Sequence, residues 1–114
     1  VVTDQIGSPT YAKDLAKIIL YIIKSKNYYL IDQPTRIYHF SNEGTCSWFD
    51  FATEIVKISG SKCLISPILS KDYHSRANRP KYAPLSSRRL IQSFGIDAIS
   101  WKDSLIKCIE NIEN

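Results

Sequence analysis

Residues 12–24 alternate between polar and apolar side chains with the period of an α-helix. Three lysines, an aspartate and a tyrosine share one stripe: Lys13, Asp14, Lys17, Tyr21 and Lys24. Leucine and isoleucine residues cover the opposite side. This 3.6-residue repeat predicts an amphipathic helix. Because the apolar side covers more than half of the circumference, we expect part of it to stay exposed in the chain alone.

Serine residues that can cap a helix start predict three further helices. These serines precede apolar residues at helical spacing: Ser47, Ser86 or Ser87, and Ser100. Asp50 and Asp103 follow the first and last of them by three residues, as in a capping box. Gly60 and Gly95 suit the left-handed turn that ends a helix. The chain should therefore contain about four helices.

Two short segments are predicted to be strands. Residues 37–40 are β-branched and aromatic, which is typical of a buried strand, and His39 would then be a core residue rather than a base. Residues 62–68 form the second segment, with Pro67 placing it near a sheet edge. Helices alternating with a few short strands indicate the α/β class in a single domain.

The composition is that of a folded, soluble domain. The 114 residues are 44% hydrophobic and 23% charged, which excludes a disordered chain. The three cysteines form no CxxC pair, so a disulfide framework or structural zinc site is not expected, and a reducing cytoplasmic setting fits better. No apolar run is long enough to cross a membrane. Because the chain contains no methionine, we interpret it as a piece of a longer protein.

The first candidate site is the loop 4–11, which belongs to the irregular segment 1–11 and leads into the first helix. Gly7 allows close approach of the backbone, and Pro9 fixes one dihedral angle. Three polar side chains in this segment can hydrogen-bond a ligand: Gln5, Ser8 and Thr10. The free N–H groups at the start of the helix would suit a polar or anionic ligand. An ordinary helix entry would carry the same residues.

The second candidate site is the basic stretch 71–89, most of which belongs to the irregular segment 70–86. Between positions 71 and 89 six basic side chains face one acid: Lys71, Arg76, Arg79, Lys81, Arg88 and Arg89 against Asp72. Tyr73 and Tyr82 are interleaved. Arginine binds phosphate oxygens in pairs, and tyrosine can stack on a base or sugar. The segment suits a nucleotide diphosphate, a nucleic-acid backbone or, more plainly, a solvated loop.

Several signals of catalysis do not occur in the chain. The four glycines are too far apart for a dinucleotide-binding loop. No tyrosine is followed by a lysine four positions later, so the pair in which lysine lowers the tyrosine pKa is missing. No histidine, cysteine or carboxylate cluster has metal-binding spacing. Trp48 and Trp101 lie on apolar helix faces, so we expect them in the core.

Four segments, in order, resemble the dTDP-4-dehydrorhamnose reductases, which are extended short-chain dehydrogenases/reductases. Residues 4–16 are similar to the family's DQxGxPTxAxDLA segment, and residues 38–52 to its YHFSNEGxxSWxxFA segment. Residues 77–85 resemble the AxRPxxSxL segment, although Tyr82-Ala83-Pro84 departs from it. Residues 94–105 match the usual end of the chain. The order and spacing agree along the whole sequence.

The resemblance implies an enzyme of dTDP-rhamnose biosynthesis, a route to bacterial cell-surface polysaccharide. Its members reduce dTDP-4-dehydro-L-rhamnose to dTDP-L-rhamnose with NADPH, which an N-terminal Rossmann domain binds. That domain also carries the catalytic Tyr and Lys, and a smaller C-terminal domain binds the sugar nucleotide. Residues 1–114 match this C-terminal part, so we expect the Rossmann domain to be absent from this chain. The chain alone should be inactive and bind no NADPH; a homodimer is left open.

The resemblance also implies which residues bind the substrate. These are Gln5, Gly7, Pro9 and Thr10 around the sugar and diphosphate, and Arg79 with Pro80 near the nucleotide. No catalytic or cofactor-binding residue is expected here, and no metal, because Lys13 stands where magnesium-binding members have an acid. Three alternatives stay open: a related epimerase or reductase for another sugar nucleotide, a non-catalytic regulatory relative and, most distant, a nucleic-acid-binding module.

Overall fold

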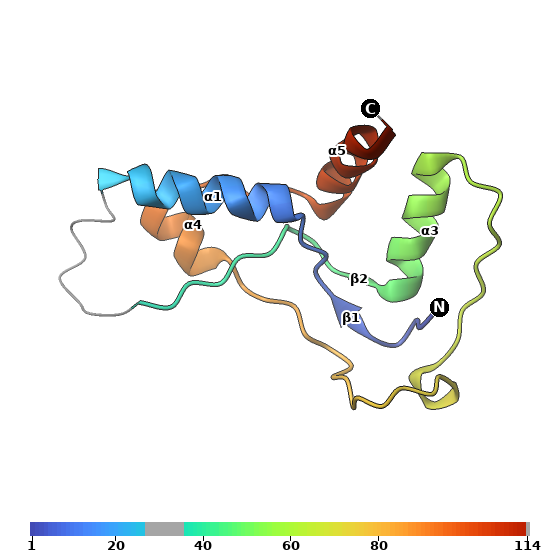
Figure 1. The fold of residues 1–114 in the computed structure, drawn as a ribbon. Coiled ribbons are helices and arrows are strands. Elements are labelled where there is room, and N and C mark those ends of the chain that lie inside the picture. The colour runs from blue at the N-terminus through green and yellow to red at the C-terminus, as the bar shows by residue number, and fades with distance from the viewer. Residues whose placement is uncertain (27–35, 114) are drawn as a thin grey trace.

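The computed structural model describes residues 1–26 and 36–113, which contain four α-helices and a two-stranded sheet. The elements run in the order β1 (Ile6–Gly7), α1 (Ala12–Lys24), β2 (Cys46–Ser47), α3 (Trp48–Ser59), the 3-10 turn η1 (Ser70–Asp72), α4 (Arg88–Phe94) and α5 (Trp101–Glu113). Figure 1 shows α1 beside α4 at one end and α3 near α5 at the other, with the small sheet between the two pairs. The predicted class and the number of helices are confirmed.

Local signals set the helix boundaries. At the start of α3 the Ser47 hydroxyl accepts the Asp50 amide at 3.0 Å, and the Asp50 carboxylate accepts the Ser47 amide at 3.0 Å. This is the predicted capping box. Gly60 ends α3 and Gly95 ends α4, each with a positive φ (64° and 62°) that only glycine adopts without strain.

Two of the predicted caps use other partners. Ser87 precedes α4, but its hydroxyl caps no helical amide. It accepts the Ser41 amide at 3.0 Å and donates to the Ser41 carbonyl at 3.2 Å, so it ties α4 to the 41–45 turn. The Ser100 hydroxyl accepts the Lys102 amide at 3.2 Å, in place of the expected exchange with Asp103.

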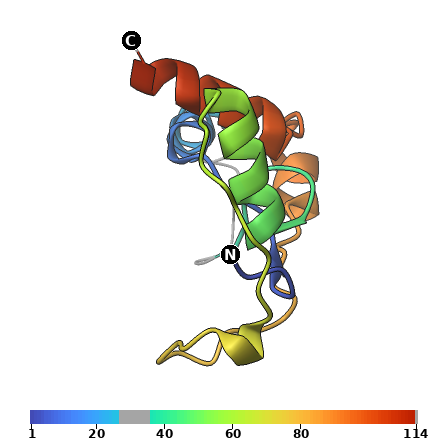
Figure 2. The ribbon, with the colours of Figure 1, turned by 90° about the vertical axis from the view of Figure 1, so that its right-hand side faces the viewer.

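The apolar side chains form two small hydrophobic cores. The first core joins α1 to α4 and buries Ile18, Leu90 and Phe94, with Tyr38 and Phe40 packed against it. The second joins β2, α3 and α5; its buried members are Cys46, Trp101 and Leu105, and its half-buried members include Phe51, Ile55 and Ile58. Figure 2 shows α3 and α5 side by side, the two helices that contribute to this second core.

A buried polar cluster connects the two cores. Asn42, only 1% exposed, donates to the Asp14 carboxylate at 3.1 Å and to the Ser104 hydroxyl at 2.9 Å. The side-chain carbonyl of Asn42 accepts a hydrogen bond from the Tyr11 backbone amide at 2.8 Å. Asp14 is only 4% exposed, although it belongs to the polar stripe of α1. The cluster holds the start of α1 against α5 and the turn that carries Asn42.

The predicted strands are wrong, apart from one residue. Residues 37–40 form no ladder; Tyr38 and Phe40 pack into the first core, and His39 is exposed rather than buried. Within 62–68 only Ile68 pairs, in a parallel bridge to Val2. β-branched and aromatic residues indicate a fit to a half-buried surface, and here that surface is a helix pair rather than a neighbouring strand.

The N-terminal segment, predicted to be irregular, is paired with three other parts of the chain. β1 pairs antiparallel with β2. On its other side the Ile6 amide donates to the Lys81 carbonyl at 2.8 Å, and the Ala83 amide donates to the Ile6 carbonyl at 2.9 Å. Upstream, the Thr3 amide donates to the Ile68 carbonyl at 3.0 Å. Distant segments are thereby drawn around residues 5–9.

α1 leaves most of its apolar side uncovered, as expected. Ile18 is the only apolar residue of this helix that is buried. Four others are exposed: Leu15, Ile19, Leu20 and Ile23. An apolar helix face of this extent normally packs against another element. None of the described helices is both long enough and apolar enough to cross a membrane.

Candidate functional site

A cavity of about 310 Å³ lies where β1, the start of α3 and residues 79–83 meet. Its walls come from the β1 segment (Gln5, Ile6, Gly7, Ser8 and Pro9), from Cys46, Ser47, Trp48 and Phe51, and from Arg79, Pro80 and Ala83. The pairing of Ile6 with both β2 and residues 81–83 brings these three segments together. We call it the β1 cavity.

Five of the six residues predicted to bind substrate line the β1 cavity. Gln5, Gly7 and Pro9 form one wall, and Arg79 and Pro80 stand on another. Thr10 does not line it: its hydroxyl donates to the Ser8 carbonyl at 3.3 Å, and it borders a separate hollow of about 110 Å³. Residues distant in the sequence are thus gathered at one site, with Thr10 outside it.

Gly7 leaves open space beside the backbone. A Cβ atom added at this position would meet no other atom within 4 Å. No neighbouring side chain therefore requires glycine here, and the room lies in the wall of the β1 cavity. A ligand group could approach the backbone closely at this point, as glycine permits.

Trp48 is a cavity residue that sequence reasoning placed in the core. It is 53% exposed and lines the β1 cavity, whereas Trp101 is buried as predicted. Helical side chains lean toward the N-terminus, so a residue at the first helical position leans past the end of the helix. The position of Trp48 directly after the capping serine could have identified it as a cavity residue from the sequence. An exposed indole offers a flat surface for a base or a sugar ring.

The β1 cavity is suited to binding rather than to bond making. Burial, together with the Asp50 carboxylate, raises the pKa of the Cys46 thiol to about 11, so this cysteine is protonated and unreactive at neutral pH. The Ser47 hydroxyl and amide hold the pKa of Asp50 below its usual value, so this carboxylate is charged and committed to the helix cap. Within residues 1–26 and 36–113, no group of three metal-binding side chains occurs.

The basic segment does not form one continuous patch. Arg79 lines the β1 cavity, whereas Arg88 lines a different one. Arg89 is used within the fold, because its guanidinium lies 5.2 Å from the centre of the Tyr38 ring and donates to the Ile37 carbonyl at 3.2 Å. The basic residues of this segment therefore lie at different sites.

The start of α1 does not provide the anion site that the sequence suggested. The Tyr11 amide donates to Asn42, and the buried Asp14 carboxylate occupies the first turn. A carboxylate already lies in the first turn of α1, so this helix end is poorly suited to a second acidic group.

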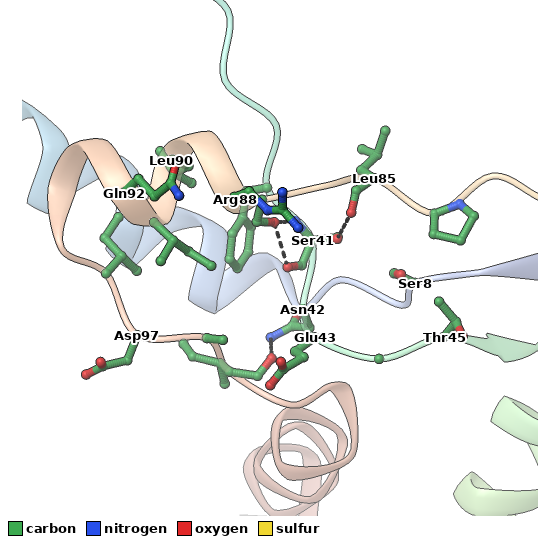
Figure 3. A pocket seen from close by; sticks show the side chains of 18 residues that line it. Ser8, Ser41, Asn42, Glu43, Thr45, Leu85, Arg88, Leu90, Gln92 and Asp97 are labelled. Atoms are coloured by element: carbon green, nitrogen blue, oxygen red, sulfur yellow. Dashed lines mark hydrogen bonds between the residues drawn. The ribbon is translucent and has the colours of Figure 1, made fainter.

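A second cavity, of about 430 Å³, lies between α4, the 41–45 turn and residues 96–99. Figure 3 shows Arg88, Glu43 and Asp97 around it, together with the hydrogen bond from the Ser41 hydroxyl to the Leu85 carbonyl. It shares Ser8 with the β1 cavity, so the two hollows are neighbours. None of the six predicted substrate residues lines it.

Comparison with known proteins identifies relatives along the whole chain. The family model of the RmlD substrate binding domain matches residues 1–114. The spore coat polysaccharide biosynthesis protein SpsK of Bacillus subtilis is 42% identical over 105 residues, which is 92% of this chain and 34% of that protein. A dTDP-4-dehydrorhamnose reductase of Aggregatibacter actinomycetemcomitans is 34% identical over 113 residues, covering 92% of this chain and 37% of that protein.

Solved structures agree with these matches. A dTDP-4-dehydrorhamnose reductase of Clostridium acetobutylicum superposes with a TM-score of 0.87 at 34% identity, over 100% of this chain and 38% of that one. The enzyme of the same name from Bacillus anthracis, solved in complex with NADP, gives a TM-score of 0.81 at 33% identity, over 97% of this chain and 36% of that one. The chain thus spans little more than a third of the length of these relatives.

Proposed function

Because the chain belongs to the family of RmlD substrate binding domains, we propose that it is the sugar-nucleotide-binding part of a dTDP-4-dehydrorhamnose reductase. The whole protein would use NADPH to reduce dTDP-4-dehydro-L-rhamnose to dTDP-L-rhamnose, in the cytoplasm, where its three free cysteines are stable. The observation that carries this proposal is the β1 cavity, which gathers five of the six residues predicted to bind this substrate.

Within the β1 cavity, each residue type suits a different part of a sugar nucleotide. Arg79 supplies a cation for the diphosphate, with Pro80 restricting its backbone. The Trp48 indole offers a flat surface for the thymine or the sugar ring. Gly7 leaves room for a ligand group beside the backbone. These residues would bind and orient the substrate and leave proton transfer to groups outside this chain.

The glycines of this chain do not form a loop that could hold the NADPH phosphates. Each positive-φ glycine serves another purpose: Gly60 and Gly95 end helices, and Gly44 lies against the Trp101 ring. We therefore assign the cofactor and the catalytic Tyr and Lys to an N-terminal Rossmann domain of the whole protein, with residues 1–114 as the sugar-nucleotide domain. The exposed apolar side of α1 is the surface where we place that domain. We leave open whether the whole protein pairs as a homodimer.

We expect the whole protein to oxidise NADPH when given dTDP-4-dehydro-L-rhamnose. The 114-residue chain alone should not catalyse this reaction and should not bind NADPH. The reason is that the chain lacks the phosphate-binding glycine loop. It also lacks the tyrosine–lysine pair in which the tyrosine donates the proton. Absorbance at the NADPH band measures turnover, and fluorescence titration measures binding to the chain. Saturable micromolar binding of NADPH by the chain would show that the division into two parts is wrong. Substrate binding by the whole protein without turnover would favour a regulatory relative.

A further inference from the structure

A hydrogen-bonded chain of three side chains lies behind one wall of the β1 cavity. Ser70, at the start of η1, donates its hydroxyl proton to the Asp4 carboxylate at 2.6 Å, and its backbone amide donates to the same oxygen at 2.8 Å. The Gln5 side-chain amide donates to the Ser70 hydroxyl oxygen at 3.0 Å. Gln5 lines the cavity, whereas Asp4 and Ser70 do not. The set of residues predicted to bind substrate contains neither Asp4 nor Ser70.

The hydrogen-bond donors and acceptors of Asp4 and Ser70 determine the orientation of the Gln5 side-chain amide. The two hydrogen bonds from Ser70 hold the pKa of Asp4 below its usual value, so at neutral pH this carboxylate is ionised and can only accept. The single hydroxyl proton of Ser70 therefore points to Asp4. The Ser70 oxygen can then only accept from Gln5, which must present its NH₂ group to Ser70. The reversed amide would set two acceptors against each other.

This orientation leaves the Gln5 carbonyl oxygen, Oε1, without a donor among the described residues. We propose that Ser70, held by Asp4, is a positioning residue that makes Gln5 present a hydrogen-bond acceptor to the β1 cavity. An acceptor selects a hydroxyl or N–H group of the ligand and does not attract phosphate oxygens. The cavity would then contact the ligand through two polar groups. Gln5 would accept a hydrogen bond from a sugar or the base, and Arg79 would bind the diphosphate. This inference rests on the proposed function.

The test compares Ser70 variants of the whole protein by calorimetric titration with dTDP-L-rhamnose and with dTDP. Ser70→Ala should weaken binding about three- to tenfold, the effect of one neutral hydrogen bond that is no longer held in place. Ser70→Thr keeps the hydroxyl and should bind nearly as the wild type does. Weakening with dTDP-L-rhamnose alone would place the ligand donor on the rhamnose, and weakening with both ligands would place it on the nucleoside, at the thymine N–H or the deoxyribose hydroxyl.

A second arm separates positioning from a general structural role. If Ser70 acts through Gln5, Ser70→Ala should add little once Gln5 is already alanine, since their effects are coupled. Ser75→Ala serves as the control, because its exposed hydroxyl contacts only the local backbone. Unchanged affinity in Ser70→Ala, or an equal loss in the Gln5→Ala background, would overturn the inference. If the wild-type protein bound neither ligand, the proposed function itself would fail.

Discussion

Replacing Asn42 with alanine should lower the free energy of unfolding by about 3 kcal/mol, a large part of the total for a domain of this size. The substitution leaves the buried Asp14 carboxylate and the Tyr11 amide without their Asn42 partner. It also removes the contacts to Ser104 and to the Ile99 carbonyl. Because buried polar groups without partners cost more than the bonds themselves gain, the loss should exceed that of a single hydrogen bond.

Urea unfolding of the chain, followed by the fluorescence of the buried Trp101, measures this loss. Asn78→Ala is the matched control, because Asn78 is exposed and should leave stability within about 0.5 kcal/mol of the wild type. Asn42→Asp should be at least as damaging as Asn42→Ala, because it would place a second carboxylate against Asp14. An Asn42→Ala chain as stable as the control would show that the polar cluster does not hold the two cores together.

Replacing Arg79 with alanine should raise KM for the dTDP-sugar roughly ten- to hundredfold in the whole protein, with kcat nearly unchanged. A charge-assisted hydrogen bond contributes about 1.5–3 kcal/mol, and each 1.4 kcal/mol is about tenfold in affinity. The diphosphate is remote from the carbon that is reduced, so its contacts stabilise ground state and transition state about equally. Affinity for NADPH should not change, because we assign that cofactor to another domain.

Steady-state kinetics with Arg76→Ala beside Arg79→Ala makes this test specific. Arg76 belongs to the same basic segment and is exposed, but it does not line the β1 cavity. Its loss should change KM by no more than about a factor of two, as for a solvated charge. Equal effects of the two variants would indicate a general electrostatic attraction, and no effect of Arg79→Ala would remove this residue from the site.

Several features that depend on neighbours in the sequence could be predicted from it, although the caps at Ser87 and Ser100 could not. The Ser47–Asp50 capping box and the glycine that ends α3 involve residues close together in the chain, and both occur as predicted. The apolar period of residues 12–24 likewise identified α1 with its observed bounds. In each case the free energy that shapes the element comes from contacts within one or two helical turns.

Features that depend on distant partners could not be predicted in this way. The partners of Asp14 are Asn42, 28 positions away, and Ser104, 90 positions away, so its burial has no local signature. The pairing of Ile6 with residues 81–83, which closes the β1 cavity, is equally remote in sequence. Residue type and the resemblance identified Gln5 and Arg79 as candidates in two separate segments, and only the folded chain shows them at one cavity.

The most direct test of this account is a crystal structure of the whole protein with dTDP-L-rhamnose bound. We expect the nucleotide in the β1 cavity, with its diphosphate at the Arg79 guanidinium and one hydroxyl or N–H group of the ligand donating to the Gln5 carbonyl oxygen. A nucleotide seated in the larger cavity beside Arg88, with Arg79 in solvent, would contradict the account.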